Sequence, residues 1–179
     1  LQTQQRQLAG KLIRLHVVAN SDSPSDQTLK LQVRDAVLAE AEPVLQMADD
    51  PEQALAGQLG ALEEAAGRTL RAAGSADSVT VTMQNERFPT RDYETFSLPA
   101  GVYRTLRVTI GAGKGHNWWC VVFPAICTAA SMDELESAAV SGGFSEADVR
   151  LITGADGGYV LKFRVLELLE ALKARLCER

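Results

Sequence analysis

The rarest side chains of this protein lie close together, in a segment that reads GAGKGHNWWCVVFPAIC at positions 111–127. Both tryptophans, one of the two histidines and two of the three cysteines fall within residues 116–127. Trp and His carry polar atoms that need partners when buried, and Cys is reactive when exposed. This segment is therefore the first candidate for specific chemistry.

Phosphate binding and nucleophilic catalysis are the first two kinds of chemistry to weigh. A glycine-rich loop with Lys114 suggests a phosphate site, but Gly115 stands where a P-loop needs Ser or Thr. His116 and Cys120 suggest a catalytic dyad, yet at about 3.3 Å per residue an extended strand separates their backbones by roughly 13 Å. Only a bend between them, or His16 donated from elsewhere, would form the dyad. The spacing argues against both readings.

Metal binding and a disulfide are the next alternatives for the cysteines. Six residues separate Cys120 from Cys127, whereas structural zinc sites usually show two to four. A mixed site is conceivable but nothing in the spacing requires it; its ligands would be His16, His116, Asp22 and Asp26. We therefore assign no metal and no cofactor. Pro124 can turn the chain and allow a disulfide between the two cysteines, and reduced buried thiols are an equal alternative.

Composition sets broad limits on function. The 179 residues are 46% hydrophobic and 23% charged, with a net charge of -5, which is typical of a globular domain. Lys and Arg are scattered, so the chain lacks the basic footprint of a nucleic-acid-binding protein. The longest apolar run, 118–126, is about half of the roughly 20 residues that a membrane-spanning helix needs. We expect neither nucleic-acid binding nor a membrane span.

Patterning predicts the elements that position these side chains. Alternating or continuous apolar residues predict strands at 12–19, 79–83, 101–110 and 118–123. Ser23, Pro24 and Asp26 predict a helix start, with Pro43 ending or kinking the helix. A second helix runs from position 51 to a cap at Gly74, and short helices follow Ser131 and Ser145. Residues 87–99 look irregular, and 165–176 predict an amphipathic helix at the end of the chain.

The predicted fold class is α/β: a single domain with a mixed sheet of about four strands, a helical pair and a C-terminal amphipathic helix. Residues 1–10 form a polar tether, and 11–179 form the domain. The glycine-rich segment 111–117 is interpreted as a hairpin between two strands. Trp118 and Trp119 then point to opposite faces of the sheet, one into the core and one outward.

Two blocks of the sequence resemble the stage II sporulation protein R family. They are LHVVANSDSPSDQTLKLQVRDAVL at 15–38 and GVYRTLRVTIGAGKGHNWWCVVFPAIC at 101–127, and FRVLELLEAL at 163–172 is similar to the end of the family's sequences. The resemblance implies a non-enzymatic signalling protein, exported into the space between the forespore and mother-cell membranes. Its implied partner is a membrane aspartic protease of the mother cell that processes pro-sigma E. Family members begin with an export or anchor segment, which we expect upstream of residue 1.

The implied location outside the cytosol favours the disulfide between Cys120 and Cys127 over reduced thiols. No binding residue follows from the resemblance itself. From the residues, we expect a partner-binding surface where two segments that follow strands meet. Its candidates are His16, Asn20, Asp22, Asp26, Lys114, His116, Asn117, Trp118 and Trp119. The alternative is a hydrolase of the same envelope space, using the histidines, Cys120 or Asp22 at a metal or nucleophilic site.

Overall fold

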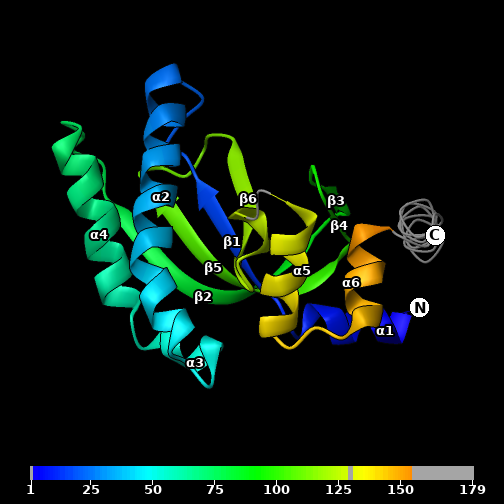
Figure 1. Ribbon diagram of the computed structural model, residues 1–179. Coiled ribbons are helices and arrows are strands. Elements are labelled where there is room, and N and C mark those ends of the chain that lie inside the picture. Colours follow the sequence, from blue (N-terminus) through cyan, green and yellow to red (C-terminus); the bar gives the residue numbers. More distant parts are fainter. Residues whose placement is uncertain (1, 129–130, 155–179) are drawn as a thin grey trace, which may run out of the picture. The chain divides into compact units, whose positions relative to one another are not determined.

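The computed structural model describes residues 2–128 and 131–154, which form helices and strands in two compact units (Figure 1). One unit, here called the sheet unit, comprises residues 13–84 and 104–123. Among the described residues, the second unit comprises 2–12, 85–103, 124–128 and 131–154. Each unit is described by itself below.

The sheet consists of four strands, β1 (Ile13–Val18), β2 (Val79–Phe88), β5 (Gly101–Ile110) and β6 (Asn117–Phe123). The end of β2 from residue 85 and the start of β5 up to residue 103 are counted with the second unit. The order of the strands is β2-β5-β1-β6, with β1 parallel to β5 and antiparallel to β6. The predicted α/β class with a four-stranded mixed sheet is confirmed. All four strands had been predicted, because apolar and β-branched residues mark each of them.

The predicted hairpin between β5 and β6 is wrong. These strands are not neighbours, since β1 lies between them and pairs with both. The connection at 111–116 therefore crosses over the carboxyl end of β1 instead of turning back beside β5. A hairpin was the simplest local interpretation, but pairing of β1 with both strands buries all six of its residues, and that burial outweighs the local preference.

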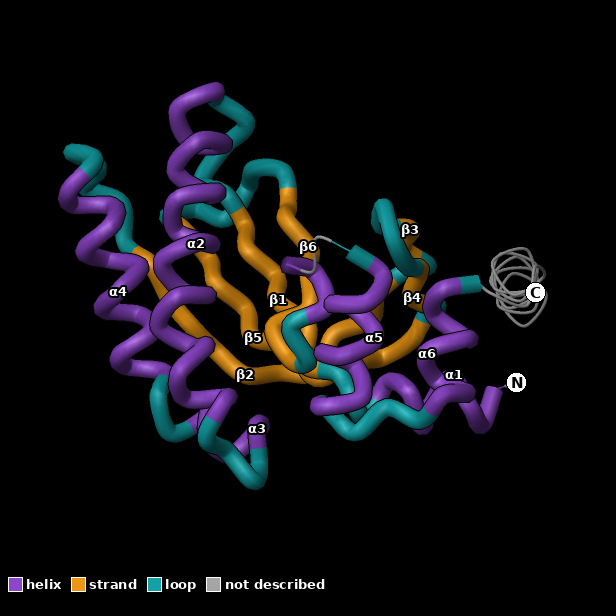
Figure 2. Tube along the Cα trace, in the orientation of Figure 1, coloured by secondary structure: helices purple, strands orange, loops and turns teal. Residues whose placement is uncertain are grey.

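Two long helices pack in the sheet unit, α2 (Pro24–Gln46) and α4 (Leu59–Ala72), and Figure 2 shows them side by side. The start of α2 is as predicted, since the Ser23 side chain accepts a hydrogen bond from the Asp26 N–H. Pro43 does not end the helix, which continues to Gln46 although the proline lacks an N–H for the helical hydrogen bond.

The second predicted helix is divided into two. Helix α3 (Pro51–Ala56) ends at its cap Gly57, and α4 begins two residues later. Glycine is a poor residue for a helix interior, but α4 itself contains Gly60 and Gly67, so glycine alone does not explain the break at Gly57. Glu52 of α3 forms an ion pair of 2.7 Å with Arg104 of β5. This ion pair gives a partner to Arg104, the charged residue on the face of β5 that otherwise carries apolar side chains.

The sheet has one face toward α2. Trp118 of β6 lies under Arg34 of α2 and pairs with Val17 of β1, and paired residues share a face. Val17 and Leu15 therefore face α2, whose buried residues include Val33 and Val37. By alternation, His16 and Trp119 lie on the opposite face.

The second unit contains short elements: α1 (Gln2–Ala9), β3 (Arg91–Asp92), β4 (Ser97–Leu98), a 3-10 turn (Ile126–Thr128), α5 (Met132–Ser141) and α6 (Glu146–Thr153). The predicted caps at Ser131 and Ser145 are confirmed, and Ser145 forms a full capping box with Asp148. Helix α1 occupies the segment for which we expected a polar tether, and β3 and β4 lie in the segment that looked irregular. The amphipathic helix predicted at 165–176 lies outside the described residues.

Among the described helices, none has the length and apolar character needed to cross a membrane.

Candidate functional site

Two loops meet at the carboxyl end of β1. The corner loop (Asn20–Asp26) follows β1 directly, and the tip loop (Gly111–His116) crosses above it on the way from β5 to β6. The amide of Ala112 donates to Oδ1 of Asn20 at 2.9 Å, and the amide of Lys114 donates to the Asn20 carbonyl at 3.1 Å. Gly115 donates to the Ala19 carbonyl at 2.9 Å. Residues about 90 positions apart thus form one hydrogen-bonded surface.

The remaining amides of the tip loop are also used. Gly111 donates to Ser78, Gly113 to Ile110, and His116 to the carboxylate of Asp22. Every backbone N–H from 111 to 116 therefore has an acceptor within the protein. A phosphate-binding loop works through amides that point at the ligand, and the tip loop has none left. Its glycines serve a different purpose.

The glycines allow the two loops to approach each other closely. A Cβ atom at Gly115 would overlap the carbonyl of Ser21, and one at Gly111 would overlap the side chain of Asn20. Gly111 also has a φ of +53°, a region that favours glycine. The tip loop is thus fitted against the corner loop at the level of the backbone, which leaves its larger side chains outside.

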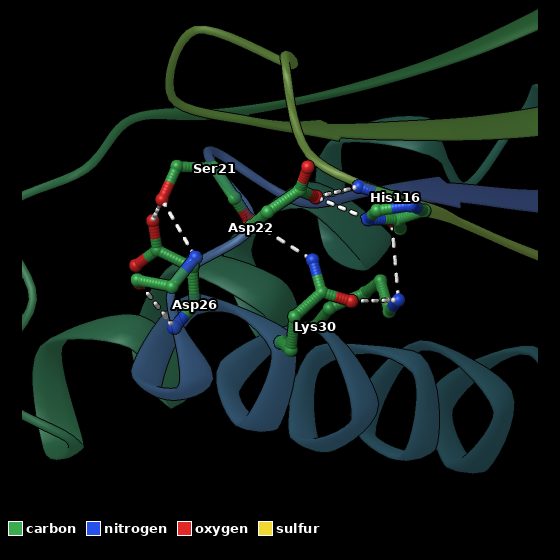
Figure 3. Close-up of polar contacts among 7 residues, drawn as sticks. Ser21, Asp22, Asp26, Lys30 and His116 are labelled. Carbon is green, nitrogen blue, oxygen red and sulfur yellow. Dashed lines mark hydrogen bonds and ion pairs between the residues drawn. The ribbon is translucent and has the colours of Figure 1, made fainter.

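His116 and Asp22 form the central contact between the loops (Figure 3). Oδ1 of Asp22 accepts a hydrogen bond from the backbone N–H of His116 at 2.6 Å. The same oxygen lies 2.5 Å from Nδ1 of the His116 ring. The backbone N–H, the ring and the charge of Lys30 hold the pKa of Asp22 below its ordinary value. The ionised carboxylate can only accept, so Nδ1 carries the hydrogen and Nε2 is left for an outside group. The His116 side chain is 78% exposed.

Asp26 turns inward and holds the corner loop together. Its carboxylate accepts hydrogen bonds from the Ser21 hydroxyl at 2.6 Å and from the Asn20 amide at 3.0 Å. The Ser21 hydroxyl is the largest cause of a lowered pKa for Asp26, and the Asn20 and Ser23 side chains add to it. Asn20 and Asp26 are half-buried. Of the acids predicted for the surface, Asp22 is the one that lies outward.

Lys30 braces the tip loop from below and was missed by the sequence analysis. Its Nζ donates to Oε1 of Gln27 at 2.6 Å and to the carbonyl of His116 at 3.1 Å (Figure 3). The side chain is buried, and burial lowers the pKa of Lys30, with the charge of Arg34 acting in the same direction. A signal was present in the sequence, since Lys30 lies one helical turn before Val33 on the buried stripe of α2.

The two tryptophans lie on opposite faces of the sheet. Trp118 is 37% exposed, with the guanidinium of Arg34 at 4.5 Å from its ring. Trp119 is half-buried and meets His16 edge to face, with 5.8 Å between ring centroids. His16 is buried and its Nδ1 lies 3.4 Å from Arg107. The two histidines therefore contact different residues on different elements.

The exposed candidates form one group, here called the tip side chains: Lys114, His116, Asn117 and Trp118. They follow one another on the tip loop and the start of β6. His16 and Trp119 belong to the other face of the sheet. In the described part of the chain, no three His, Cys, Asp or Glu side chains form a group that could hold a metal ion.

The two cysteines predicted to pair belong to different units. Cys120 is buried in the sheet unit, and Cys127 is half-buried in the second unit. Their disulfide stays a prediction, and a count of free thiols on unreduced protein tests it. One free thiol, that of Cys177, is expected; three would contradict the bridge. Cys177 itself lies outside the described residues.

The fold and the site together define an α/β protein in which a glycine-rich loop, braced by its neighbours, carries exposed side chains. Comparison with known proteins identifies the family. The model of the stage II sporulation protein R family matches residues 9–133, and the chain belongs to this family. The match includes both loops and the whole of β6. The family's name denotes a sporulation protein and no class of enzyme, so a role in sporulation follows.

One curated relative is the stage II sporulation protein R of Bacillus subtilis (strain 168). It is 38% identical to this chain over 118 residues, which cover 64% of the chain and 53% of the relative. The chain thus spans about half the length of that relative. No solved structure matches the chain.

Proposed function

We propose that this protein is an exported sporulation signal that acts in the space between the forespore and mother-cell membranes. There it activates the mother cell's membrane aspartic protease, which processes pro-sigma E. Activation works through protein-protein contact, and the chain itself catalyses no reaction. Membership of the stage II sporulation protein R family supports the sporulation role, and the remaining steps are what that family resemblance implies.

The observation that carries the contact mechanism is the rigid presentation of the tip side chains. The backbone of the tip loop is held by six amide hydrogen bonds, so this backbone loses little further freedom on binding. Exposed Trp and His beside polar groups are typical of the residues that dominate binding energy at interfaces. We therefore assign the protease contact to Lys114, His116, Asn117 and Trp118.

The hydrolase alternative receives less support from this geometry. A nucleophilic site needs a base within hydrogen-bond reach of the nucleophile. His116 is bonded to Asp22, and His16 lies against Trp119 and Arg107. Cys120 is buried and lies on the face of the sheet that packs toward α2. Asp22 orients His116 as it would a general base, but among the described residues the contacts of His116 include no Ser, Thr or Cys side chain that could serve as its nucleophile.

The test is activation of the protease in cells. The chain is expressed behind an export signal in sporulating Bacillus subtilis that lacks its own stage II sporulation protein R, and cleavage of pro-sigma E is followed by immunoblot. We expect the unaltered chain to restore cleavage. Trp118→Ala and His116→Ala should abolish it while leaving the thermal unfolding of the purified chain within a few degrees of the original.

The matched control is Met47→Ala, because Met47 is an exposed apolar side chain at the end of α2, away from both loops. It should restore cleavage fully. Full cleavage with both Trp118→Ala and His116→Ala would remove the proposed contact from this surface. Stoichiometric metal in the purified protein, or loss of cleavage on Cys120→Ser with protease binding intact, would favour the hydrolase.

A further inference from the structure

The strand β2 forms one edge of the four-stranded sheet (Figure 2). Within the part of the chain that the structure describes, β5 pairs with one side of β2 and no strand pairs with the other side. A strand edge presents a row of backbone N–H and C=O groups that can pair with another chain. Folded proteins therefore protect such edges, and the start of β2 has a specific contact of this kind.

Two hydrogen bonds show which backbone groups of β2 point away from the sheet. The carbonyl of Ser78, just before the strand, accepts the N–H of Gly111 at the end of β5 at 2.7 Å, so it points toward β5. Three positions later, the N–H of Val81 donates to Oε2 of Glu63 on α4 at 3.0 Å. Backbone groups of successive residues in a strand point to opposite sides. Every second residue from 79 to 83 therefore has its N–H and C=O on the free side.

Glu63 reaches this edge from α4, which lies over the start of β2. Cγ1 of Val79 is 3.9 Å from the position that a Cβ at Gly67 of α4 would take. Glu63 precedes Gly67 by one helical turn, so the packing of α4 on β2 brings the carboxylate of Glu63 to the N–H of Val81. Among the described residues Glu63 has no basic partner, whereas its neighbour Glu64 pairs with two arginines of α4. The carboxylate of Glu63 is thus used for the strand edge.

The sequence of this edge suits pairing with a copy of itself. Residues 79–85 contain no charged residue and no proline, and Val and Thr favour strands. In an antiparallel pair with its two-fold axis at Val81, the N–H of each Val81 meets the carbonyl of the other. Thr80 then faces Thr82 of the second copy, and no like charges of the two strands oppose each other. The Val81 N–H at the centre of this pair is the one that Glu63 covers.

We propose that the start of β2, residues 79–83, is a strand-pairing surface for a second copy of this chain, and that Glu63 holds it closed. The carboxylate occupies the central N–H, and a second strand would have to bury its charge without a cation. Two copies of Glu63 would also meet beside the axis, where like charges repel. The inference is independent of the proposed function, because β2 carries none of the tip side chains.

The test measures association of the full chain by sedimentation velocity from micromolar to millimolar concentration. Glu63→Ala should lower the dissociation constant of the dimer about tenfold or more relative to the original chain, because pairing no longer buries two carboxylates. The matched control is Glu64→Ala, which removes the neighbouring acid of the same helix and its pairs with Arg68 and Arg71. It should sediment as the original chain does. Glu63 is exposed, so thermal unfolding of both variants should stay close to that of the original.

Charge pairs in the Glu63→Ala background test the register. Thr80 and Thr82 are exposed and face each other across the proposed axis. Thr80→Lys with Thr82→Lys places like charges opposite each other and should return the chain to a monomer. Thr80→Lys with Thr82→Glu places opposite charges there and should keep the dimer. Hydrogen exchange at the Val81 amide should slow with rising concentration in Glu63→Ala alone and in this second pair.

Three results would each overturn the inference. The first is a Glu63→Ala chain that associates no more than the original. The second is equal association of Glu64→Ala, which would assign the effect to the loss of negative charge in general. The third is a dimer that survives both charge pairs equally, which would place the contact away from β2.

Discussion

The corner loop and the tip loop use their polar groups in opposite ways. In the corner loop the side chains of Asn20 and Ser21 turn inward and donate to Asp26, and Asp22 alone of its acids faces outward. In the tip loop the backbone turns inward and the side chains of Lys114 and His116 stay outside. One loop is therefore a support and the other a surface. This division places recognition on a backbone that is already ordered before a partner arrives.

The largest expected effect comes from adding a methyl group where the loops touch. Gly115→Ala places a Cβ on the carbonyl of Ser21, and a backbone atom cannot rotate away as a side chain can. We expect a loss of about 3 kcal/mol in the free energy of unfolding, measured by urea denaturation. Activation of the protease should fall as well, because the tip loop must lift from its support.

The matched control is Gly60→Ala, in the first turn of α4, where nothing lies within 4 Å of an added Cβ. Alanine favours the helix over glycine, so this variant should gain about 0.5 to 1 kcal/mol. If Gly115→Ala were as stable as the original chain, the close fit of the two loops would be wrong.

The second effect is the loss of the side chain that joins the loops. Asn20→Ala removes the acceptor of the Ala112 amide and a donor to Asp26. We expect a loss of about 1 to 2 kcal/mol, because the Ala112 amide loses its acceptor and the half-buried Asp26 loses one of its donors. Hydrogen exchange at the Ala112 amide should accelerate. Asn117→Ala removes the same side chain from an exposed position and should change stability by less than about 0.5 kcal/mol; equal losses would contradict the division into support and surface.

Local features of both loops could be predicted from the sequence. The Ser23 cap and the strand before it depend on residues a few positions apart, and both are confirmed. The sequence also predicts Asn20, Asp22 and His116 as candidates for one binding surface, because each lies in a segment that follows a strand. The local signals were correct because each is decided within one turn or one strand.

Long-range pairing could not be predicted in the same way. A glycine-rich connection between two strands favours a hairpin locally, and only the insertion of β1 between β5 and β6 brings His116 to Asp22. The burial of His16 has the same origin, since β1 has a neighbour on each side. The role of Lys30 depends on its bond to the His116 carbonyl, which lies 86 positions away in the sequence, and no residue near Lys30 indicates that contact.

A third, pH-dependent effect should report on both loops. Hydrogen bonds lower the pKa of Asp22 and of Asp26 in the folded protein. A carboxyl group whose pKa is lowered by folding stabilises the protein above the pKa of the unfolded chain, about 3.9 for Asp. That contribution is lost as pH falls through the lower folded value. Thermal unfolding should therefore shift to lower temperature below about pH 4.

The double variant Asp22→Asn with Asp26→Asn should flatten this acid dependence, because the amide groups do not titrate. Some acid dependence should remain from Asp148. Its carboxyl is partly buried, and burial alone would raise its pKa. Hydrogen bonds from Lys11 and Ser145 outweigh burial and lower the pKa. Asp49→Asn, an exposed residue outside both loops, serves as the control. An unchanged acid dependence in the double variant would show that the loops are not held by these carboxylates.

The smallest change in the free energy of unfolding should come from the contact between Arg34 and the exposed Trp118. Arg34→Met removes the cation over Trp118 and the ion pair to Asp35, while its apolar stem still covers the ring. An exposed cation–π contact and an exposed ion pair are each worth about 0.5 to 1 kcal/mol or less, so urea denaturation should show only a small loss. Arg68→Met, which removes an exposed pair with Glu64, should behave similarly. Suppose that Arg34→Met alone lowered the free energy of unfolding by more than about 2 kcal/mol. Trp118 and α2 would then support the tip loop as Asn20 does. The surface would be stabilised from the helix as well as from the corner loop.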